Sequence, residues 1–296
     1  SIVDINQDGK PDIYVTNYRK EPNVLLVNER GTLIDKSFDY DLRGYDKNGY
    51  FGHSNGSVWC DLNNDGWLDL IVGNLAHPME LASSDKTIIY KNNFGKFEDV
   101  SNLSGIHYQE SDYQPSLSDM DLDGDLDMIV TATYKRGKLN LYNNLGNFVF
   151  AEISSKADIL PLFTTHSAWS DFDNDGDEDF FVILGDQGSL AVYENATPHE
   201  NDFLEIQLVG LKNQNAIGSE ISIIDAKGIT LGKRYVKGAY GNGVQDTYLQ
   251  HFGFKKMTYT LPLKAFIRWT WTKYPETIMI PEVNKRIIVR ETSRIS

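Results

Sequence analysis

The sequence is short of several features that would place it in common protein classes. It has a single cysteine, Cys60, so no disulfide can form within the chain. No stretch of 18 apolar residues occurs, so the pattern predicts no membrane-spanning helix. Lysine and arginine number 28 against 42 aspartates and glutamates, and the formal net charge is −14. This balance disfavours nucleic acids and anionic membrane surfaces as partners and favours cations.

The acidic residues are concentrated in four short segments. Residues 4–12 and 61–69 hold three carboxylates each, residues 119–127 hold five, and residues 171–179 hold six. Four divalent cations carry eight positive charges and would reduce the net charge from −14 to −6. The charge imbalance therefore indicates a demand for bound metal more than a general solvating surface.

These four segments are copies of one motif, D-x-[DN]-x-D-G-x-x-D, whose first aspartates are 57, 58 and 52 residues apart. Each copy runs into an apolar triplet, and further short strands follow. An asparagine comes 16 residues after the last aspartate in three copies and 23 residues after it in the second: Asn28, Asn143, Asn195 and Asn92. Repeats of about 50–60 residues with four strands each predict the blades of a β-propeller.

The composition changes after Asn195. Residues 196–202 form a polar connector, and no acidic motif follows it. Strand-like runs continue at 203–209, 219–225, 247–254, 265–272, 276–280 and 286–291. We therefore expect an all-β protein with propeller blades over residues 1–198 and a small β-sandwich or barrel over residues 199–296. Trp269 and Trp271 alternate along one strand, so at least one should lie in this second core.

The motif has the chemistry of a calcium loop. Calcium takes six to eight oxygen ligands, and positions 1, 3, 5 and 9 supply four oxygen-bearing side chains. Glycine at position 6 permits the positive φ of a tight turn. Lys10 and Trp67 at position 7 can offer only a backbone carbonyl. The predicted ligands of up to four Ca²⁺ ions are Asp4, Asn6, Asp8, Lys10, Asp12, Asp61, Asn63, Asp65, Trp67, Asp69, Asp119, Asp121, Asp123, Asp125, Asp127, Asp171, Asp173, Asp175, Asp177 and Asp179.

Other interpretations of the motif fit less well. Position 12, where an EF-hand has a bidentate glutamate, is valine in every copy, which indicates a strand after the loop. No cysteine or histidine lies among the predicted ligands, which disfavours transition metals. Magnesium would require stricter octahedral geometry. The remaining alternative is a set of bare Asx turns, in which five carboxylates within nine residues would repel one another.

The four motifs resemble the calcium-binding loops of FG-GAP/VCBS repeats, the blade units of integrin-α-type β-propellers. The resemblance covers residues 1–195 and implies at least four blades. Integrin-type propellers have seven blades, and this sequence starts three residues before its first motif. We therefore expect a fragment of seven blades, from which earlier residues and any export signal have been removed.

The remainder of the chain is similar to the ASPIC/UnbV domain, which follows such repeats in the cartilage acidic protein family. The segments that carry the similarity are 203–210, 217–219, 249–253, 267–269 and 287–289. The sequence departs from that domain at residues 241–246 and 271–275. The order of the two parts agrees with that family.

These resemblances imply a secreted, extracellular or cell-surface protein, with the periplasm as an alternative location. They imply a calcium-stabilised adhesion, matrix or binding module with a protein or glycan partner and no catalytic residues. One alternative is an enzyme, dehydratase- or cyclase-like, whose site lies in the propeller channel near His53 or His166. Another is a structural subunit of a surface filament or matrix that self-assembles through exposed blade edges.

Overall fold

The structure of the protein is a computed structural model of the 296-residue chain. It describes residues 1–19, 21–45, 51–75, 85–107, 109, 112–134, 137–159, 163–185, 188–198, 200–238, 245–270, 272 and 274–292. Trp271, which belonged to a prediction above, lies outside these residues. The described part of the chain is β-structure with one short 3-10 turn at Ser101–Leu103.

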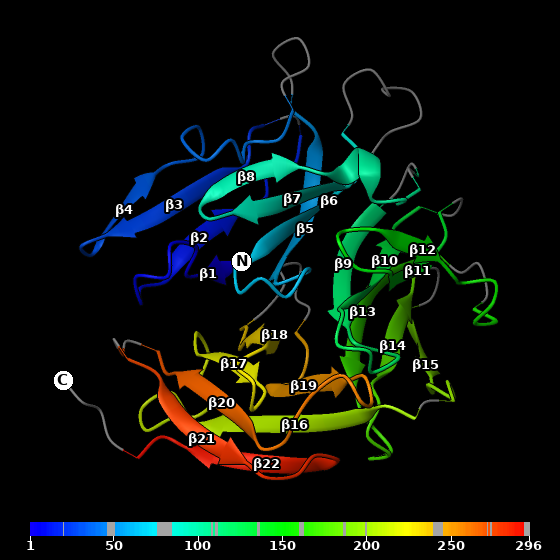
Figure 1. Cartoon of the computed structure of the whole chain (residues 1–296). Coiled ribbons are helices and arrows are strands. Elements are labelled where there is room, and N and C mark those ends of the chain that lie inside the picture. Colours follow the sequence, from blue (N-terminus) through cyan, green and yellow to red (C-terminus); the bar gives the residue numbers. More distant parts are fainter. Residues whose placement is uncertain are drawn as a thin grey trace.

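Within each acidic repeat, consecutive strands pair in an antiparallel meander, and the repeats form a row (Figure 1). The strands of the third and fourth repeats are joined into one sheet by a single pairing, Ala132 with Thr164. Blade 1 contains β1 (Ile2–Val3), β2 (Asp12–Val15), β3 (Val24–Glu29) and β4 (Thr32–Asp35). Blade 2 contains β5 (His53–Cys60), β6 (Asp69–Leu75), β7 (Ile88–Asn93) and β8 (Lys96–Asp99). Blade 3 contains β9 (Asp112–Ser118), β10 (Asp127–Ala132), β11 (Asn140–Asn144) and β12 (Phe150–Glu152). Blade 4 contains β13 (Thr164–Ser170), β14 (Asp179–Leu184) and β15 (Ser189–Tyr193).

Strand alternation gives every blade two apolar rows, one on each face of its sheet. The row that faces the preceding blade, here called the leading row, is Trp59–Leu70–Tyr90 in blade 2. The trailing row, which faces the next blade, is Val58–Ile71–Ile89. The same registers give leading rows Leu117–Met128–Tyr142 and Trp169–Phe180–Tyr193 in blades 3 and 4.

The rows of adjacent blades pack together and form three apolar cores. Tyr14 and Leu25 of blade 1 meet the leading row of blade 2. The trailing row of blade 2 meets Met128 and Tyr142 of blade 3. Ile129 of blade 3 meets the leading row of blade 4. Cys60 is a buried free thiol within the second core, and burial raises its pKa.

The two end faces of this row of blades differ from the inner faces. The trailing row of blade 4 is Ala168–Phe181–Val192, and Val192 is 47% exposed. The leading row of blade 1 is Ile2–Ile13–Leu26, and Ile2 is 55% exposed. Within the described residues no other sheet packs on either row. The four blades therefore form an open arc, with one apolar row uncovered at each end.

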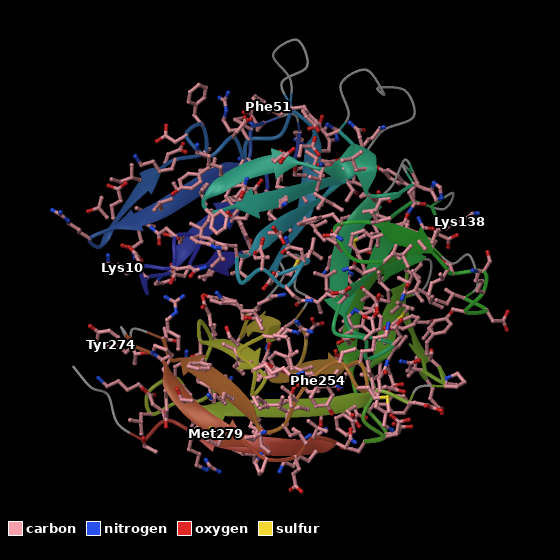
Figure 2. All side chains as sticks on the ribbon, viewed as in Figure 1. Lys10, Phe51, Lys138, Phe254, Tyr274 and Met279 are labelled. Atoms are coloured by element: carbon pink, nitrogen blue, oxygen red, sulfur yellow. The ribbon has the colours of Figure 1, made fainter. Side chains whose placement is uncertain are left out.

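The C-terminal part is a sandwich of two sheets. One contains β19 (Leu249–Phe254), β16 (Asp202–Val209) and β22 (Lys285–Arg290), with β16 and β22 parallel. The other contains β18 (Thr230–Tyr235), β17 (Glu220–Ile224), β20 (Leu263–Arg268) and β21 (Glu276–Ile280). One apolar core lies between them, and it includes buried Trp269, as predicted. Figure 2 labels Phe254 within this sandwich and Met279 on its outer side.

The sequence analysis identified every strand of the sandwich except β18. Each end of the other six strands lies within two residues of the expected end, with one exception. Strand β20 ends at Arg268, where residue 272 was expected. The described part of the chain contains no helix with the length and apolarity that a membrane crossing requires. The sandwich lies along one side of the blade arc, with β17 and β18 facing the blades (Figure 1).

Candidate metal sites

The four acidic motifs occupy equivalent places in the blades. Each joins the first strand of a blade to the second, and each lies at the end of the blade that faces the sandwich. We call them loop 1 (residues 4–12), loop 2 (61–69), loop 3 (119–127) and loop 4 (171–179). All four therefore lie along one side of the arc.

The backbone of each loop is left-handed at two positions. Glycine at position 6 has a positive φ in every copy, between 83° and 103°, as predicted. Position 4 is also left-handed, although it is not glycine: Gln7, Asn64, Leu122 and Asn174. The two left-handed residues turn the intervening peptide groups inward, so that backbone N–H groups point at the first aspartate.

The first aspartate accepts the turn's N–H groups on its two oxygens. In loop 1, Asp8 N–H donates to Asp4 Oδ1 at 3.0 Å and Gly9 N–H donates to Oδ2 at 2.8 Å. Loop 2 repeats this with distances of 3.0 and 2.9 Å on Asp61. In loop 3, Gly124 N–H donates to Asp119 Oδ2 at 3.1 Å. The first carboxylate therefore fixes the shape of the loop.

The last aspartate is buried in every copy and ties three segments together. In loop 2, Asp69 accepts the N–H of Leu62 on Oδ2 (3.0 Å) and the N–H of Asn92 on Oδ1 (2.7 Å). The Asn92 side chain donates to Leu68 O at 2.9 Å. Loops 1 and 4 repeat this arrangement with Asn28 and Asn195. The carboxylate thus joins its loop to the third strand of the blade.

In blade 3 the asparagine that bonds the last aspartate is one residue further along the chain. Asn144, 17 residues after Asp127, donates its N–H to Asp127 Oδ1 at 2.8 Å and its amide to Leu126 O at 3.0 Å. Asn143, which has the spacing of 16 residues seen in blades 1 and 4, donates its side-chain amide to Asp121 Oδ2 at 2.9 Å. The segment between β10 and β11 places one more residue before the hydrogen-bonded position, which no spacing rule anticipates.

Carboxylates converge in two of the loops. Asp119, Asp121 and Asp127 place one oxygen each within 4.8 Å of one another, and Asp171, Asp173 and Asp179 do the same. Each group could hold a metal ion. In loops 1 and 2 the third position is Asn6 or Asn63, so the corresponding set contains an amide oxygen. The assignment of the predicted residues as calcium ligands stays a prediction in all four loops.

Burial raises the pKa values of these carboxyls. It raises the pKa of Asp12 and of Asp61 to about 6, that of Asp119 to about 7 and that of Asp69 to about 8. Neighbouring aspartates of the same loop add to the effect, for example Asp61 on Asp69. A buried, closely spaced set of carboxylates is costly to ionise unless a cation compensates the charge.

In loop 3, one of the two carboxylate oxygens of Asp119 is buried and has no donor among the described residues. Asp119 is 1% exposed, and its Oδ1 accepts no hydrogen bond from the described residues. Its other oxygen accepts two N–H groups, from Gly124 and from Gly253 of the sandwich. A buried carboxylate oxygen without a partner is costly, and a hard cation held with Asp121 and Asp127 would satisfy it. The donor set in loop 3 therefore fits an oxygen-coordinated ion such as calcium.

Neighbouring loops are connected to each other, which the sequence analysis missed. Gln7 at position 4 of loop 1 donates to Gly66 O of loop 2 at 3.2 Å. Asn64 at position 4 of loop 2 donates to Gly124 O and Asp125 Oδ1 of loop 3, at 3.2 and 2.8 Å. Position 4 carries an amide side chain in three copies, Gln7, Asn64 and Asn174, and this was the only signal for the link in the sequence.

A basic residue of the sandwich contacts each of the four loops. Arg268 lies 2.9 Å from Asp4, Arg234 lies 4.0 Å from Asp119, and Arg286 lies 3.7 Å from Asp171. Lys233 donates to Gly66 O of loop 2 at 3.0 Å, and its charge lowers the pKa of Asp61 against the larger effect of burial. The sequence analysis did not foresee these contacts.

The channel histidines of the enzyme alternative are packed against aromatic rings. His53 on β5 lies 4.8 Å from the ring of Tyr18, and His166 on β13 lies 5.7 Å from that of Tyr113. A polar cavity of about 70 Å³ lies between β13 and the sandwich, lined in part by Glu178. It has room for a few water molecules. Two other cavities, one lined in part by Trp169 and Tyr193 and one by His107, measure about 420 and 480 Å³, which is the size of typical substrate pockets.

Three comparisons with known proteins bear on these sites. Among solved structures, the crystal structure of the V. cholerae biofilm matrix protein Bap1 has a TM-score of 0.36 and 11% sequence identity. The alignment covers 95% of this chain and 50% of that chain, so this chain spans about half its length. The search of curated proteins found no match.

The family comparison agrees with the repeat found in the sequence. The FG-GAP-like repeat family matches three overlapping segments, residues 4–72, 61–130 and 119–182. Each match starts at the first aspartate of a loop and ends in the strand after the next loop. Together they span more than half of the chain. The chain therefore belongs to the family of FG-GAP-like repeat proteins.

Proposed function

We propose that this chain is an extracellular or cell-surface adhesion or matrix module whose blades are stabilised by up to four calcium ions. The observation that carries the calcium assignment is the buried, unpartnered Oδ1 of Asp119, which lies in a group of three converging carboxylates. Membership of the FG-GAP-like repeat family supports a binding role. The partner in this proposal is a protein or a glycan at the extracellular surface.

Calcium has a structural role in this proposal. The last aspartate of each loop already joins the loop to the third strand of its blade through two N–H groups. An ion held beside it would offset the repulsion between the carboxylates and fix the turn. Extracellular calcium sites of this chemistry bind at about 0.1–1 mM, so they would fill outside the cell and not in the cytosol.

We assign the sandwich to the ASPIC/UnbV type as part of the same proposal. The residues that carried that similarity form buried strands, among them β16, β19 and β20. Trp269 is in the sandwich core, and its indole donates to Glu276 at 2.9 Å. The unmatched segment 241–246 lies mostly outside the described residues.

A thermal melt with and without a chelator tests the calcium role. We expect the melting temperature to fall when calcium is removed and to recover with about 1 mM calcium but poorly with magnesium. Metal analysis of the purified protein gives the number of bound ions. An unchanged melt, together with no calcium in the protein, would overturn the proposal and leave the loops as bare turns.

A second candidate function is self-assembly into a surface filament or matrix. It is favoured by the uncovered rows at the two ends of the arc, Ala168–Phe181–Val192 and Ile2–Ile13–Leu26. Within the arc, the trailing row of each blade packs on the leading row of the next blade. By the same pattern, the trailing row of blade 4 in one copy should pack on the leading row of blade 1 in a second copy. Two copies would contribute eight blades, within the usual range of about 4–8 for closed propellers.

Light scattering at several protein concentrations tests this assembly. We expect dimers or larger species, and we expect Val192→Glu to give a monomer because it places a charge in the uncovered row. The matched control is Leu211→Glu, at a site in the sandwich that is 56% exposed and outside both rows. A wild-type chain that stays monomeric at every concentration would exclude assembly through these faces.

A further inference from the structure

We propose that the C-terminal sandwich is a cap whose docking on the blades is coupled to cation binding by the loops, so that loss of the metal releases it. This inference rests on the proposed calcium binding. It adds a conformational consequence that the stabilising role alone does not require. The argument depends on where the sandwich touches the loops.

The two parts of the chain have opposite charge. Residues 1–198 contain 33 acidic and 14 basic side chains, a net charge of −19. Residues 199–296 contain 9 acidic and 14 basic side chains, a net charge of +5. The sandwich therefore complements the acidic side of the blade arc, and its charge favours docking there.

The sandwich contacts the first aspartates through one particular oxygen. Arg268, Arg234 and Arg286 approach Oδ2 of Asp4, Asp119 and Asp171, respectively. In loop 3 the N–H of Gly253 also donates to Asp119 Oδ2, at 2.9 Å. The other oxygen, Asp119 Oδ1, accepts no bond from the described residues. The Asp119 carboxylate can therefore contact the cap through Oδ2 and a cation in the loop through Oδ1.

Several further contacts need the loop in its folded shape. The His251 ring Nε2 lies 2.9 Å from Gly176 O of loop 4, and Asn201 donates to Asp121 O of loop 3 at 3.0 Å. Phe203 packs against Gly176, where a Cβ would overlap the aromatic ring. These contacts are to backbone atoms of the turns, so they are lost when the turns change conformation.

The charge of the loops and their conformation predict opposite effects of metal removal on docking of the sandwich. Charge alone predicts tighter docking, because metal-free loops are more negative. The Arg286–Asp171 pair, however, has an arginine that is 40% exposed, and exposed pairs contribute little. The backbone contacts depend on a turn that repelling carboxylates would open. We therefore infer that the conformation of the loops, more than their charge, determines whether the sandwich docks. Calcium binding and docking of the cap are then cooperative.

The experiment measures binding and docking separately on the full chain. Isothermal titration gives calcium affinity, and small-angle scattering gives the radius of gyration with calcium and with a chelator. We expect a compact particle with calcium and an extended one without it. Compactness should persist with calcium in about 1 M salt, where the Debye length is about 3 Å.

Gly253→Ala breaks docking without changing charge. Its Cβ would overlap the Asp119 carboxylate and the Leu122 backbone of loop 3. We expect an extended particle even with calcium and, by reciprocity, a roughly tenfold loss of affinity at one site, within the usual coupling range of about 5–150-fold. Gly232→Ala on β18 is the matched control, because its Cβ meets only ordinary contacts. Phe203→Ala is a second docking variant that introduces no overlap.

The outcomes separate this inference from the function on which it rests. If the wild-type chain binds calcium but its radius of gyration is the same or smaller with chelator, the coupling is refuted and the calcium role stands. Unchanged calcium affinity in both Gly253→Ala and Phe203→Ala, with docking lost, refutes the coupling as well. If titration detects no calcium binding, both proposals fail.

Discussion

The blades and the sandwich bury their polar groups in different ways. In the sandwich the interior between two sheets is apolar, and the basic residues Lys233 and Arg234 of β18 point to its blade side. In the blades the interior is apolar between neighbouring sheets, but each loop also buries carboxylates, such as Asp69 and Asp127, at 0–1% exposure. The sandwich also buries single carboxylates, such as Asp225, whereas loops 3 and 4 each bring three carboxylates together, and such a group is costly to ionise without a cation.

This contrast explains why aspartates that make similar hydrogen bonds behave differently. Asp225 of the sandwich accepts the N–H groups of Lys227 and Ile229 at 2.9 Å, and these and other hydrogen bonds outweigh burial, so that its pKa is lowered. Asp127 of loop 3 accepts the N–H groups of Met120 and Asn144, yet burial and the neighbouring Asp121 and Asp119 raise its pKa well above the usual value. The difference lies in the neighbouring charges and in the depth of the site.

The largest expected effect is the pH dependence of the calcium-free protein. The raised pKa values mean that the native state binds more protons than the unfolded chain between about pH 4 and pH 8. The free energy of unfolding should therefore decrease as pH rises through this window, by several kcal/mol, since each pKa unit is about 1.4 kcal/mol. Chemical denaturation in chelator at pH 5 and pH 8 measures it.

Calcium should reverse this pH dependence. Protons and calcium compete for the same carboxylates, so calcium should stabilise the protein more at pH 8 than at pH 5. Blades whose stability in chelator increases from pH 5 to pH 8 would contradict the assignment of buried, uncompensated carboxylates.

The next effect is that of Asp127→Ala in loop 3. The substitution leaves the N–H groups of Met120 and Asn144 without their acceptor and removes one member of the three-carboxylate group. We expect a loss of about 2–5 kcal/mol with calcium present, since each buried unsatisfied group costs about 1–3 kcal/mol. Asp225→Ala is the control, and its smaller effect should not depend on calcium. If the loss of unfolding free energy depends equally on calcium in the two variants, the buried carboxylates of blades and sandwich do not differ in their need for a cation.

A core substitution in the sandwich should have an effect that calcium does not alter. Ile267 is fully buried between the sheets, so Ile267→Ala should cost about 2–5 kcal/mol. Calorimetry with and without chelator should show the same loss in the transition of the sandwich. Ile71→Ala, in the trailing row of blade 2, is the counterpart in the blades. A loss for Ile267→Ala that changes with calcium would indicate that the two parts unfold as one unit.

The smallest effect concerns the link between loops. Asn64→Ala removes the hydrogen bonds to Gly124 O and Asp125 and should cost about 1 kcal/mol. It should also weaken any cooperativity between calcium ions in loops 2 and 3. Lys10→Ala is the control, because its contact to Asp8 is an exposed ion pair, worth about 0–1 kcal/mol. Identical calcium titration curves for Asn64→Ala and wild type would show that the loops act independently.

The loops and blades were predictable because their signals are local. Glycine at position 6 marked the left-handed residue, and the apolar triplet after each motif marked the second strand of the blade. The spacing of 16 residues did not identify Asn144, the residue that bonds the last aspartate in blade 3, because the connection between β10 and β11 differs in length from those of blades 1 and 4. Strand β18 was missed because Gly232, Lys233 and Arg234 break its apolar pattern. Their burial comes from tertiary contacts, for example of Lys233 with loop 2 and of Arg234 with Phe252 of the sandwich.

The sequence by itself determined the repeat, because each copy of the motif is defined by spacing within nine residues, and it predicted the two-part division and the residues able to bind a hard cation. Only the tertiary structure decided which apolar rows are covered and which carboxylate oxygen faces the sandwich. These features join residues far apart in the sequence, such as Ile71 and Met128 in the packed rows, or Asp119 and Gly253, which are 134 positions apart. No local pattern encodes such contacts, because they follow from how whole sheets stack.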